Sequence, residues 1–384
     1  MKPELVITGA GVVSAIGVGK DANLESLLHA RSGVAPVRYL ATGLKDFPVG
    51  EVKRSNEELA DLCGAPSCWP RTTLLSICAL QEALQEAGLA DGRGMRLIGG
   101  TTVGGMDLTE KVYPHYSSNH GCGATTDLAA LYIGGFEDAT TLSTACSSAT
   151  NALIFGANLL RTGQYERVVV GGSESLSNYH LNGFNSLMIL DREPCRPFDA
   201  TRAGLNLGEG AAYLVLETLE SALQRGAQPL ARLSGFGNAC DAFHQTASSE
   251  NGEGAFLAMQ KALQRAGLQP SQIDYINAHG TGTPNNDASE STALRRIFDG
   301  MVPPVSSTKA LTGHTTSASG SIEAVFCLLA LQHGFIPPQP NWHTPDPACV
   351  TPCTRALQKP LRHVLSNAFG FGGNDSSFIL SVYE

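Results

Sequence analysis

A duplication inside the chain restricts its possible folds more than any other feature of the sequence. Residues 79–89 read ALQEALQEAGL, and residues 258–268 read AMQKALQRAGL. Both segments have apolar residues at the spacings of three and four that predict an amphipathic helix, and both contain the Gly that commonly follows a helix. A short apolar segment typical of a strand comes after each, and then a turn rich in Gly and Thr, GTTVGG at 100–105 and HGTGTP at 279–284. Such a repeat predicts two structurally related halves.

The parallel between the halves extends to other segments. A loop rich in Ser and Thr leads into an apolar helix at 143–160, and a second such loop does so at 307–332. The openings of the halves also match, LVITGAG at 5–11 and ARLSGFG at 231–237. Short continuous apolar runs between helices are typical of strands that are covered on both faces. We therefore expect an α/β fold with two sheets layered among helices and related by a pseudo-twofold axis.

The composition supports this organisation and excludes several kinds of partner. The chain has 384 residues, 42% of them hydrophobic, which is enough for two core-forming halves, residues 1–220 and 221–384. A net charge of −9 without a dense Lys/Arg run argues against nucleic-acid binding. An acidic partner would need a local basic patch, although ordinary solvated charge is the simpler interpretation of each cation. The candidates for such a patch are Arg54, Arg71, Lys111 and Arg202.

Neither the cysteines nor the apolar segments indicate a metal, a nucleotide or a membrane span. The ten cysteines lack the paired spacing of zinc sites, so we expect mostly buried thiols and a reducing cytoplasm. GAG at 9–11 has no acidic residue at the offset that a dinucleotide site needs. Residues 139–160 are uncharged but too rich in Ser, Thr and Asn for a membrane span, and a buried helix is the better interpretation.

One cysteine and two histidines stand in matched loops of the two halves. Cys146 lies in TACSS, directly before the apolar helix, where the helix dipole favours a thiolate. His279 follows a strand, at the kind of position where sites form in layered α/β folds, and His314 precedes a helix. Taken singly, each has a structural role as its simpler interpretation, such as the buried small hydrophobe that most free cysteines are. Together they form a specific constellation for nucleophilic chemistry.

A second glycine-rich turn, GFGGND at 370–375, follows a predicted strand. Backbone N–H groups in such a turn can point at a developing oxyanion, although a glycine-rich turn is a weak signal by itself.

Five segments together closely resemble the elongating β-ketoacyl-[acyl carrier protein] synthases of bacterial fatty-acid and type II polyketide synthesis. These condensing enzymes belong to the thiolase superfamily. The resemblance runs nearly from end to end and implies the thiolase-like five-layered αβαβα fold, built from two duplicated βα halves. It also implies that no cofactor is needed, because the substrates are carried on the phosphopantetheine arm of acyl carrier protein. The segments are TACSSATNA, RPFDATRAGLNLGEGAA, NAHGTGTPNNDASE, SSTKALTGHTTSASG and NAFGFGGND.

The resemblance assigns a role to each candidate residue. Cys146 is expected to hold the acyl chain as a thioester, while its own N–H and that of Phe371, beside Gly370, form the oxyanion hole. His279 and His314 are expected to bind the malonyl thioester carbonyl and stabilise the enolate that forms as CO2 departs. This enolate then attacks the acyl thioester, a decarboxylative Claisen condensation that adds two carbons.

Further residues match supporting positions of the family. Lys309 and Glu290 match a pair that orients the site, and a cation near His314 would also disfavour its protonation. Thr281 and Thr283 match hydroxyls that bind the pantetheine arm, and Phe371 matches a gate over the nucleophile. No catalytic metal is implied. In some relatives a structural monovalent cation is held at the positions that correspond to Asn277, Glu323, Ser366 and Asn367.

Departures from the family pattern point to a specialised pathway. The stretch between Thr102 and Cys146, which shapes the acyl pocket and the dimer contact in the family, is shorter than in typical housekeeping members. GFGGND stands where many members have GFGGTN, and the region from Cys63 to Trp69, near the usual docking site of the carrier protein, is poorly basic. These features suggest polyene or aryl-polyene synthesis by a homodimer, or by a heterodimer with a chain-length-factor subunit.

Two alternatives remain open. A thiolase that works without decarboxylation would need a second catalytic Cys near the last glycine loop, where the sequence places none. A non-catalytic chain-length-factor subunit would generally lack the nucleophile, so the intact set of Cys146, His279 and His314 disfavours it. An initiating ketosynthase would have Asn in place of His314.

Overall fold

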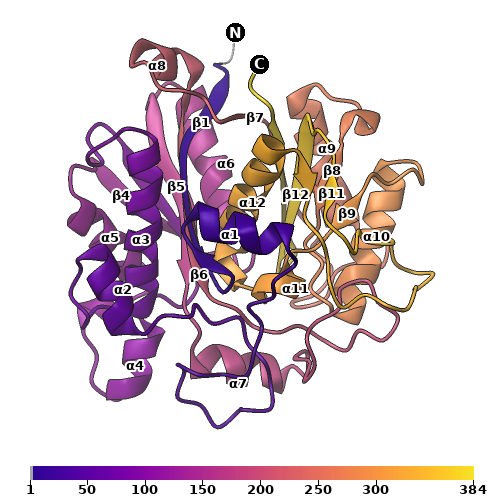
Figure 1. The fold of residues 1–384 in the computed structure, drawn as a ribbon, viewed down its shortest axis with the longest axis horizontal. Coiled ribbons are helices and arrows are strands. Elements are labelled where there is room, and N and C mark those ends of the chain that lie inside the picture. The colour runs from indigo at the N-terminus through magenta and orange to yellow at the C-terminus, as the bar shows by residue number, and fades with distance from the viewer. Residues whose placement is uncertain (1–2) are drawn as a thin grey trace.

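The strands of both halves lie side by side in one large mixed sheet. A computed structural model of the chain describes residues 3–384, so the first two residues of the expected first half lie outside the described residues (Figure 1). The sheet has 11 strands in the order β4-β3-β5-β6-β1-β7-β13-β12-β8-β9, with β2 paired to β1. The strands are β1 (Leu5–Ser14), β2 (Gly17–Val18), β3 (Arg96–Gly100), β4 (Asp138–Leu142), β5 (Arg167–Glu174), β6 (Gly210–Thr218), β7 (Ala231–Cys240), β8 (Tyr275–Asn277), β9 (Val305–Ser306), β12 (His363–Gly370) and β13 (Asn374–Ser381). A separate pair is formed by β10 (Phe335–Ile336) and β11 (Leu357–Gln358).

The two halves are joined where β1 meets β7. These strands pair antiparallel at only two positions, Val6 with Arg232 and Ile7 with Ala231. The sequence predicted two sheets, whereas the hydrogen-bonded path is continuous through this short contact. The reason is that the matching first strands of the halves lie beside each other, so the contact falls between them.

Helices cover the sheet on both faces, and the pairs that the duplication predicts are present (Figure 1). The α-helices are α1 (Lys20–Leu28), α2 (Asn56–Cys63), α3 (Arg71–Glu86), α4 (Met106–Val112), α5 (Ala124–Ile133), α6 (Ser148–Arg161), α7 (Asn178–Ser186), α8 (Leu219–Gln224), α9 (Glu253–Ala266), α10 (Pro284–Ile297), α11 (Lys309–Thr312) and α12 (Ser319–His333). Short 3₁₀ turns occupy Ser118–His120, Pro270–Gln272 and Thr316–Ala318. Among the described residues no helix is both long and apolar enough to cross a membrane.

Matched glycines explain why β1 and β7 begin their halves with the same pattern. A Cβ atom at Gly9 or Gly11 would lie 2.2 or 2.1 Å from a backbone oxygen of α3, and one at Gly235 or Gly237 would lie 2.1 or 2.2 Å from a backbone oxygen of α9. Only glycine permits such a close approach of a helix to a strand. The repeat in the sequence therefore reflects the same strand-to-helix contact built twice.

The central helices α6 and α12 carry the loops that the sequence singled out. They lie next to each other in the middle of the molecule (Figure 1), and residues 319–331 of α12 are all buried. The buried helix expected over 139–160 begins only at Ser148, because residues 138–142 form β4 at the edge of the sheet. The N-terminal ends of α6 and α12 are thus brought together from opposite halves of the sequence.

Candidate active site

Cys146 stands in a tight turn between β4 and α6. Ala145 has φ of 52°, a left-handed conformation that costs an L-residue of order 1 kcal/mol. The turn is closed by Ser148, whose hydroxyl donates to the carbonyl of Ala145 (2.6 Å) and accepts from the N–H of Thr144 (2.9 Å). This geometry places Cys146 two residues before the first residue of the helix, as the sequence predicted.

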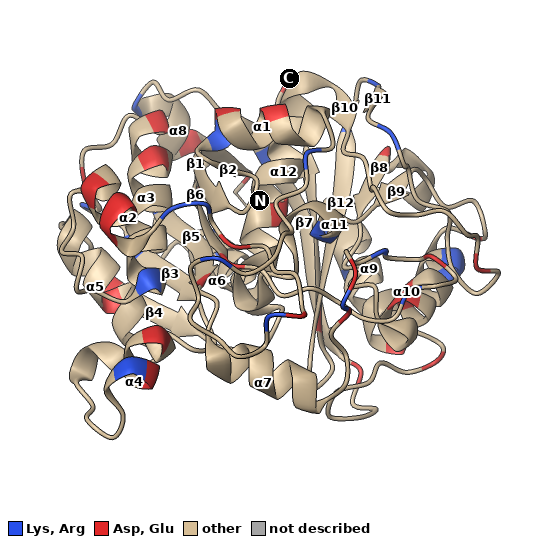
Figure 2. Ribbon diagram, turned by 60° about the horizontal axis from the view of Figure 1, so that its bottom comes forward, with Lys and Arg blue, Asp and Glu red and all other residues tan. Residues whose placement is uncertain are grey.

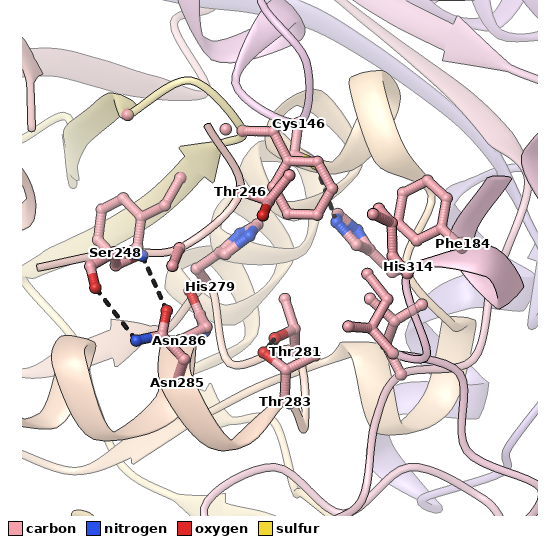
Figure 3. A pocket seen from close by; sticks show the side chains of 18 of the residues that line it. Cys146, Phe184, Thr246, Ser248, His279, Thr281, Thr283, Asn285, Asn286 and His314 are labelled. Atoms are coloured by element: carbon pink, nitrogen blue, oxygen red, sulfur yellow. Dashed lines mark hydrogen bonds between the residues drawn. The ribbon is translucent and has the colours of Figure 1, made fainter. Parts of the chain in front are cut away.

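The structure brings the two predicted histidines to this thiol. Nε2 of His314 lies 3.2 Å from Sγ of Cys146, and Nδ1 of the same ring lies 3.0 Å from the hydroxyl of Ser319. The rings of His279 and His314 are 5.3 Å apart and nearly perpendicular, at 84°. Figure 3 shows both imidazoles lying next to Cys146 in one pocket. The constellation expected from the matched loops is therefore present as a single site.

The pocket around these residues has a volume of about 320 Å³ and two kinds of wall. One wall is apolar and includes Phe184, whose ring stacks on the ring of Phe371 at a centroid distance of 5.8 Å. The other is polar and includes Asn285, which exchanges hydrogen bonds with the backbone of Ser248 (Figure 3). The sequence analysis missed Phe184, Leu187, Ile189, Leu205, Thr246, Ser248, Asn285 and Asn286. Of these, Asn285 and Asn286 lie in the motif that holds His279, and Leu205 lies in RPFDATRAGLNLGEGAA, so these two motifs were the signals available.

Burial makes the thiol a neutral group in this site. It raises the pKa of Cys146 to about 11, although nearby Lys309 and the backbone N–H of Phe371 both lower it. The expectation of a thiolate from the helix dipole is therefore wrong, because desolvation outweighs the favourable local fields. A neutral thiol needs a base in contact with it, and Nε2 of His314 is in that position.

Both histidines are neutral as well. Burial lowers the pKa of His279 and of His314 well below the usual range, and the charge of Lys309 lowers both pKa values further. A neutral imidazole has one donor nitrogen and one acceptor nitrogen, so either ring can donate to a carbonyl oxygen without carrying a charge. This agrees with the predicted effect of a cation near His314.

The orienting residues are connected differently from what the sequence suggested. Lys309 does not pair with Glu290; its ammonium forms a buried ion pair with Glu323 at 2.5 Å. Glu290 instead accepts hydrogen bonds from the backbone N–H groups of His279 (2.9 Å) and Gly280 (2.8 Å). Burial raises the pKa of each of these two carboxyl groups to about 7. Glu290 thus fixes the turn at His279, and Glu323 pairs with the ammonium of Lys309.

Three of the four candidate cation ligands have unpaired buried oxygen atoms. Oδ1 of Asn277, Oε2 of Glu323 and Oγ of Ser366 are buried without a hydrogen-bond partner among the described residues. Asn277 and Ser366 are direct neighbours on the parallel strands β8 and β12. The side chain of Asn367, in contrast, donates to Glu290 and accepts from Ser377. Three of the four side chains therefore have a buried oxygen free to bind a cation, and the fourth does not.

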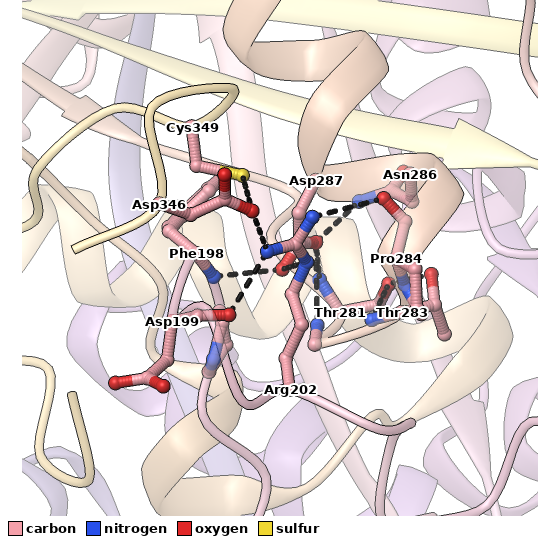
Figure 4. A network of polar contacts seen from close by, with 12 residues as sticks. Phe198, Asp199, Arg202, Thr281, Thr283, Pro284, Asn286, Asp287, Asp346 and Cys349 are labelled. Atoms are coloured by element: carbon pink, nitrogen blue, oxygen red, sulfur yellow. Dashed lines mark hydrogen bonds and ion pairs between the residues drawn. The ribbon is translucent and has the colours of Figure 1, made fainter. Parts of the chain in front are cut away.

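The turn that carries Thr281 and Thr283 is held by a buried polar network (Figure 4). The hydroxyls of the two threonines lie 2.8 Å apart. The carboxylate of Asp287 accepts from the N–H groups of Thr281 (3.0 Å) and Phe198 (2.8 Å). Arg202 donates to the carbonyl of Pro284 and also pairs with Asp346. This network presents both hydroxyls to the pocket, as their predicted role requires.

Two of the four cations considered for a docking patch are excluded by their position. Arg71 is buried and paired with Glu209 at 2.7 Å, and the side chain of Arg202 is only 7% exposed. Arg54 and Lys111 are exposed. Figure 2 shows Lys and Arg interspersed with Asp and Glu along the ribbon. Only Arg54 and Lys111 therefore remain available to a partner.

Comparison with known proteins covers the whole chain. Residues 2–222 match the family described as "Beta-ketoacyl synthase, N-terminal domain", and residues 230–343 match "Beta-ketoacyl synthase, C-terminal domain". The chain is 35% identical to Nodulation protein E of Rhizobium meliloti over 398 residues, 98% of each chain. It is 33% identical to 3-oxoacyl-[acyl-carrier-protein] synthase 2 of Synechocystis sp. over 420 residues, covering 100% of this chain and 99% of that relative.

Solved structures agree with these matches. The ishigamide ketosynthase/chain length factor superimposes with a TM-score of 0.92 at 31% identity, covering 100% of both chains. The ketosynthase ApeO, in complex with its chain length factor ApeC from Xenorhabdus doucetiae, gives 0.86 at 32% identity, with 99% and 98% covered.

Proposed function

The chain belongs to the β-ketoacyl synthase family, and we propose that it extends a fatty-acyl, polyketide or polyene chain by decarboxylative Claisen condensation with malonyl-carrier protein. The predicted thiolase-like fold is confirmed by its solved relatives. The enzyme is an acyltransferase, and its substrates are carried on acyl carrier protein rather than by an added cofactor. The division into residues 1–220 and 221–384 and a cytoplasmic location stay predictions.

One observation carries the proposal: the 3.2 Å contact between Sγ of Cys146 and Nε2 of His314, with His279 beside it in a buried pocket. A thiol, a base and a second neutral donor are the groups that acyl transfer followed by decarboxylation requires. The pocket is also walled by apolar side chains, which suits a hydrocarbon chain.

Loading begins when Sγ of Cys146 attacks the thioester carbonyl of the acyl-carrier protein. His314 accepts the thiol proton and returns it to the departing pantetheine sulfur. The backbone N–H groups of Cys146 and Phe371 stabilise the oxyanion that forms between these events. Their influence on the resting thiol, whose pKa both lower, supports this role.

Condensation begins with malonyl-carrier protein in the emptied site. His279 donates a hydrogen bond to its thioester carbonyl, and His314 donates a second one from Nε2 in its other neutral tautomer, in which Nδ1 accepts from the hydroxyl of Ser319. The C–C bond to the carboxylate then breaks to release CO2. The electron pair forms an enolate, which attacks the acyl carbonyl on Cys146. The sulfur of Cys146 then leaves as a thiolate and takes up a proton from solvent water, because the release of CO2 supplies none. Glu290 acts through the backbone of His279, and Lys309 keeps both imidazoles neutral.

The pantetheine arm is proposed to bind Thr281 and Thr283, whose hydroxyls line the pocket. Gly370 and Phe371 line it as well, and Phe371 stacked on Phe184 is in the position of a gate. A monovalent cation held by Asn277, Glu323 and Ser366 would satisfy their unpaired oxygens and stiffen the contact between β8 and β12. Asn367 is left out of this proposal because its side chain is used elsewhere.

The alternatives are not favoured. A thiolase would need a second thiol at the reacting atoms. Cys240 does lie beside the last glycine turn in space, with its Sγ 3.9 Å from the carbonyl oxygen of Gly372, which the sequence analysis did not foresee. Cys240 is exposed and does not line the pocket, so it cannot serve as that thiol. A non-catalytic chain-length factor would not need the Cys146–His314 contact.

We further propose that the enzyme works as a dimer, either with itself or with a chain-length-factor-like ketosynthase, because two solved relatives are ketosynthase–chain-length-factor assemblies. Tyr113 and Tyr116, after α4, are 72% and 66% exposed, and β4 is an edge strand of the sheet. These apolar side chains and the free strand edge suit burial against a second chain.

Mass spectrometry after incubation with hexanoyl-carrier protein tests the activity. We expect the wild type to gain the mass of one hexanoyl group and Cys146→Ala to gain none. Cys240→Ala is the matched control, since it removes an exposed thiol beside the same turn and should label like the wild type. Absence of an adduct on the wild type, with a carrier protein that another ketosynthase accepts, would show the proposal to be wrong.

A further inference from the structure

The two N–H donors of the oxyanion hole belong to segments that are far apart in the sequence. The donor of Cys146 precedes α6, and that of Phe371 follows β12. An oxyanion is stabilised only when both donors lie at about 2.7–3.1 Å from one position in space. Some group must therefore hold these two segments in register.

A cluster of three asparagine side chains connects the two segments. Asn374 lies three residues after Phe371, at the start of β13, and its Oδ1 accepts three hydrogen bonds. The donors are Nδ2 of Asn151 (2.8 Å), Nδ2 of Asn238 (2.9 Å) and the hydroxyl of Ser147 (3.1 Å), which shares its one hydrogen with the carbonyl of Thr144 (2.7 Å). Ser147 adjoins Cys146, and Asn151 lies in the first turns of α6. A single oxygen atom thus ties the glycine turn to the loop of the nucleophile.

The same cluster reaches the strained turn itself. Nδ2 of Asn151 also donates to the hydroxyl of Thr144 at 2.8 Å, one residue before the left-handed Ala145. Oδ1 of Asn151 accepts from Asn238 (3.0 Å) and from Ser376 (2.8 Å) on the neighbouring strands β7 and β13. The turn of Cys146 is therefore held from outside by two strands of the other half of the chain.

The backbones of the two segments are in contact, with no space for a side chain between them. A Cβ atom at Gly370 would lie 2.7 Å from the carbonyl oxygen of Thr144 and 3.1 Å from the hydroxyl of Ser147. Close contact fixes the separation of the segments, but it does not prevent one from sliding along the other. The directional hydrogen bonds to Asn374 supply the lateral constraint.

We propose that Asn374 is a positioning residue that aligns the N–H groups of Cys146 and Phe371 for acyl transfer, with Asn151 and Asn238 as its partners. Its acceptor oxygen makes all three of its side-chain hydrogen bonds. The inference rests on the proposed function and adds the alignment of its oxyanion hole.

Two variants distinguish the role of the Asn374 acceptor oxygen from that of its side-chain volume. Asn374→Leu keeps the approximate volume and removes the acceptor, so the rate of hexanoyl transfer to Cys146 should fall about 10- to 100-fold, as for a small misalignment of reacting groups. Asn374→Asp keeps the acceptor oxygen and should stay within about threefold of the wild type. Asn158→Leu, an exposed position farther along α6, is the matched control and should not change the rate.

The readout that distinguishes alignment from general damage is alkylation of Cys146 by iodoacetamide. Alkylation forms no oxyanion, but the thiolate is the species that reacts, so the rate is measured over a range of pH and corrected for the thiolate fraction. The corrected rate in Asn374→Leu should remain within about twofold of the wild type while acyl transfer falls. Equal losses in both reactions, or an unchanged rate of acyl transfer in Asn374→Leu, or a loss in Asn374→Asp as large as in Asn374→Leu, would each overturn the inference. Failure of the wild type to form any acyl adduct would instead contradict the proposed function and remove the basis of the inference with it.

Discussion

A single methyl group at Gly208 should displace His314 from the thiol. The N–H of Gly208 donates to the carbonyl of His314 at 2.9 Å, and the N–H of His314 donates to the carbonyl of Asn206 at 2.7 Å. The segment around Gly208 therefore fixes the position of the His314 backbone relative to the pocket. A Cβ atom at Gly208 would lie 2.4 Å from the carbonyl oxygen of Thr312, two residues before His314.

The size of the effect follows from that distance. Real Cβ atoms essentially never come closer than 3.0 Å to a neighbour, so Gly208→Ala must move the Thr312 carbonyl or its own strand by at least about 0.6 Å. Over-packing of this kind costs about 1–3 kcal/mol of folding free energy. A shift of nearly 1 Å at a catalytic group can reduce a rate by about 100-fold, so we expect a loss of about 10-fold or more here.

Three measurements check this prediction. Release of CO2 from malonyl-carrier protein reports on the histidines, thermal unfolding reports on the strain, and alkylation by iodoacetamide reports on the contact of His314 with Cys146. All three should change in Gly208→Ala. The control is Gly183→Ala in α7, an exposed position where a Cβ atom meets nothing within 4 Å and where alanine favours the helix. If Gly208→Ala released CO2 within twofold of the wild type and melted at the same temperature, the assignment of this contact would be refuted.

Three further perturbations have directions that the structure sets. His279→Ala should reduce CO2 release from malonyl-carrier protein by about 100-fold or more and acyl loading by less than about 10-fold; equal losses in the two assays would contradict its assigned step. Lys309→Met should lower the free energy of unfolding by about 3–5 kcal/mol, because it leaves Glu323 buried and unpaired. The loss should be smaller at about pH 6 than at about pH 8 in denaturant titrations, because Glu323 can take up a proton at the lower pH. Asp375→Asn should raise the melting temperature, because burial raises the pKa of Asp375 to about 8 from 3.8, so the native carboxyl destabilises the fold increasingly as the pH rises between these values. The gain should therefore be larger at about pH 9 than at about pH 5, and a gain that did not depend on pH would contradict this origin.

Local periodicity was sufficient to predict the duplicated architecture and the meeting of Cys146 with both histidines. The repeated helices and glycine patterns are local, and the expected twofold relation between the halves predicted which loops face each other. The wall of the pocket could not be predicted in this way, because Leu187, Ile189 and Thr246 lie in irregular segments without a periodic pattern.

Electrostatic details also depended on three-dimensional contacts. The ion-pair partner of Lys309 is Glu323, on the following long helix α12. From the sequence, Glu290 was an equally good candidate for this partner. The pKa of Cys146 depends on how completely its neighbours exclude water, which no spacing reveals. The continuous sheet similarly depends on how closely β1 and β7 approach at two residue pairs.

The position of β13 in the sheet determines when, during folding, the chain becomes able to accept an acyl group. This strand is inserted between β7 and β12, and Asn374 is its first residue. During synthesis, N-terminal segments fold first, so Cys146 is present long before the residues that would make it reactive. Until Asn374–Ser381 has joined the sheet, the thiol lacks an aligned pair of N–H donors. An incomplete chain should consequently be unable to capture acyl groups from carrier proteins, and only the finished fold can enter the catalytic cycle.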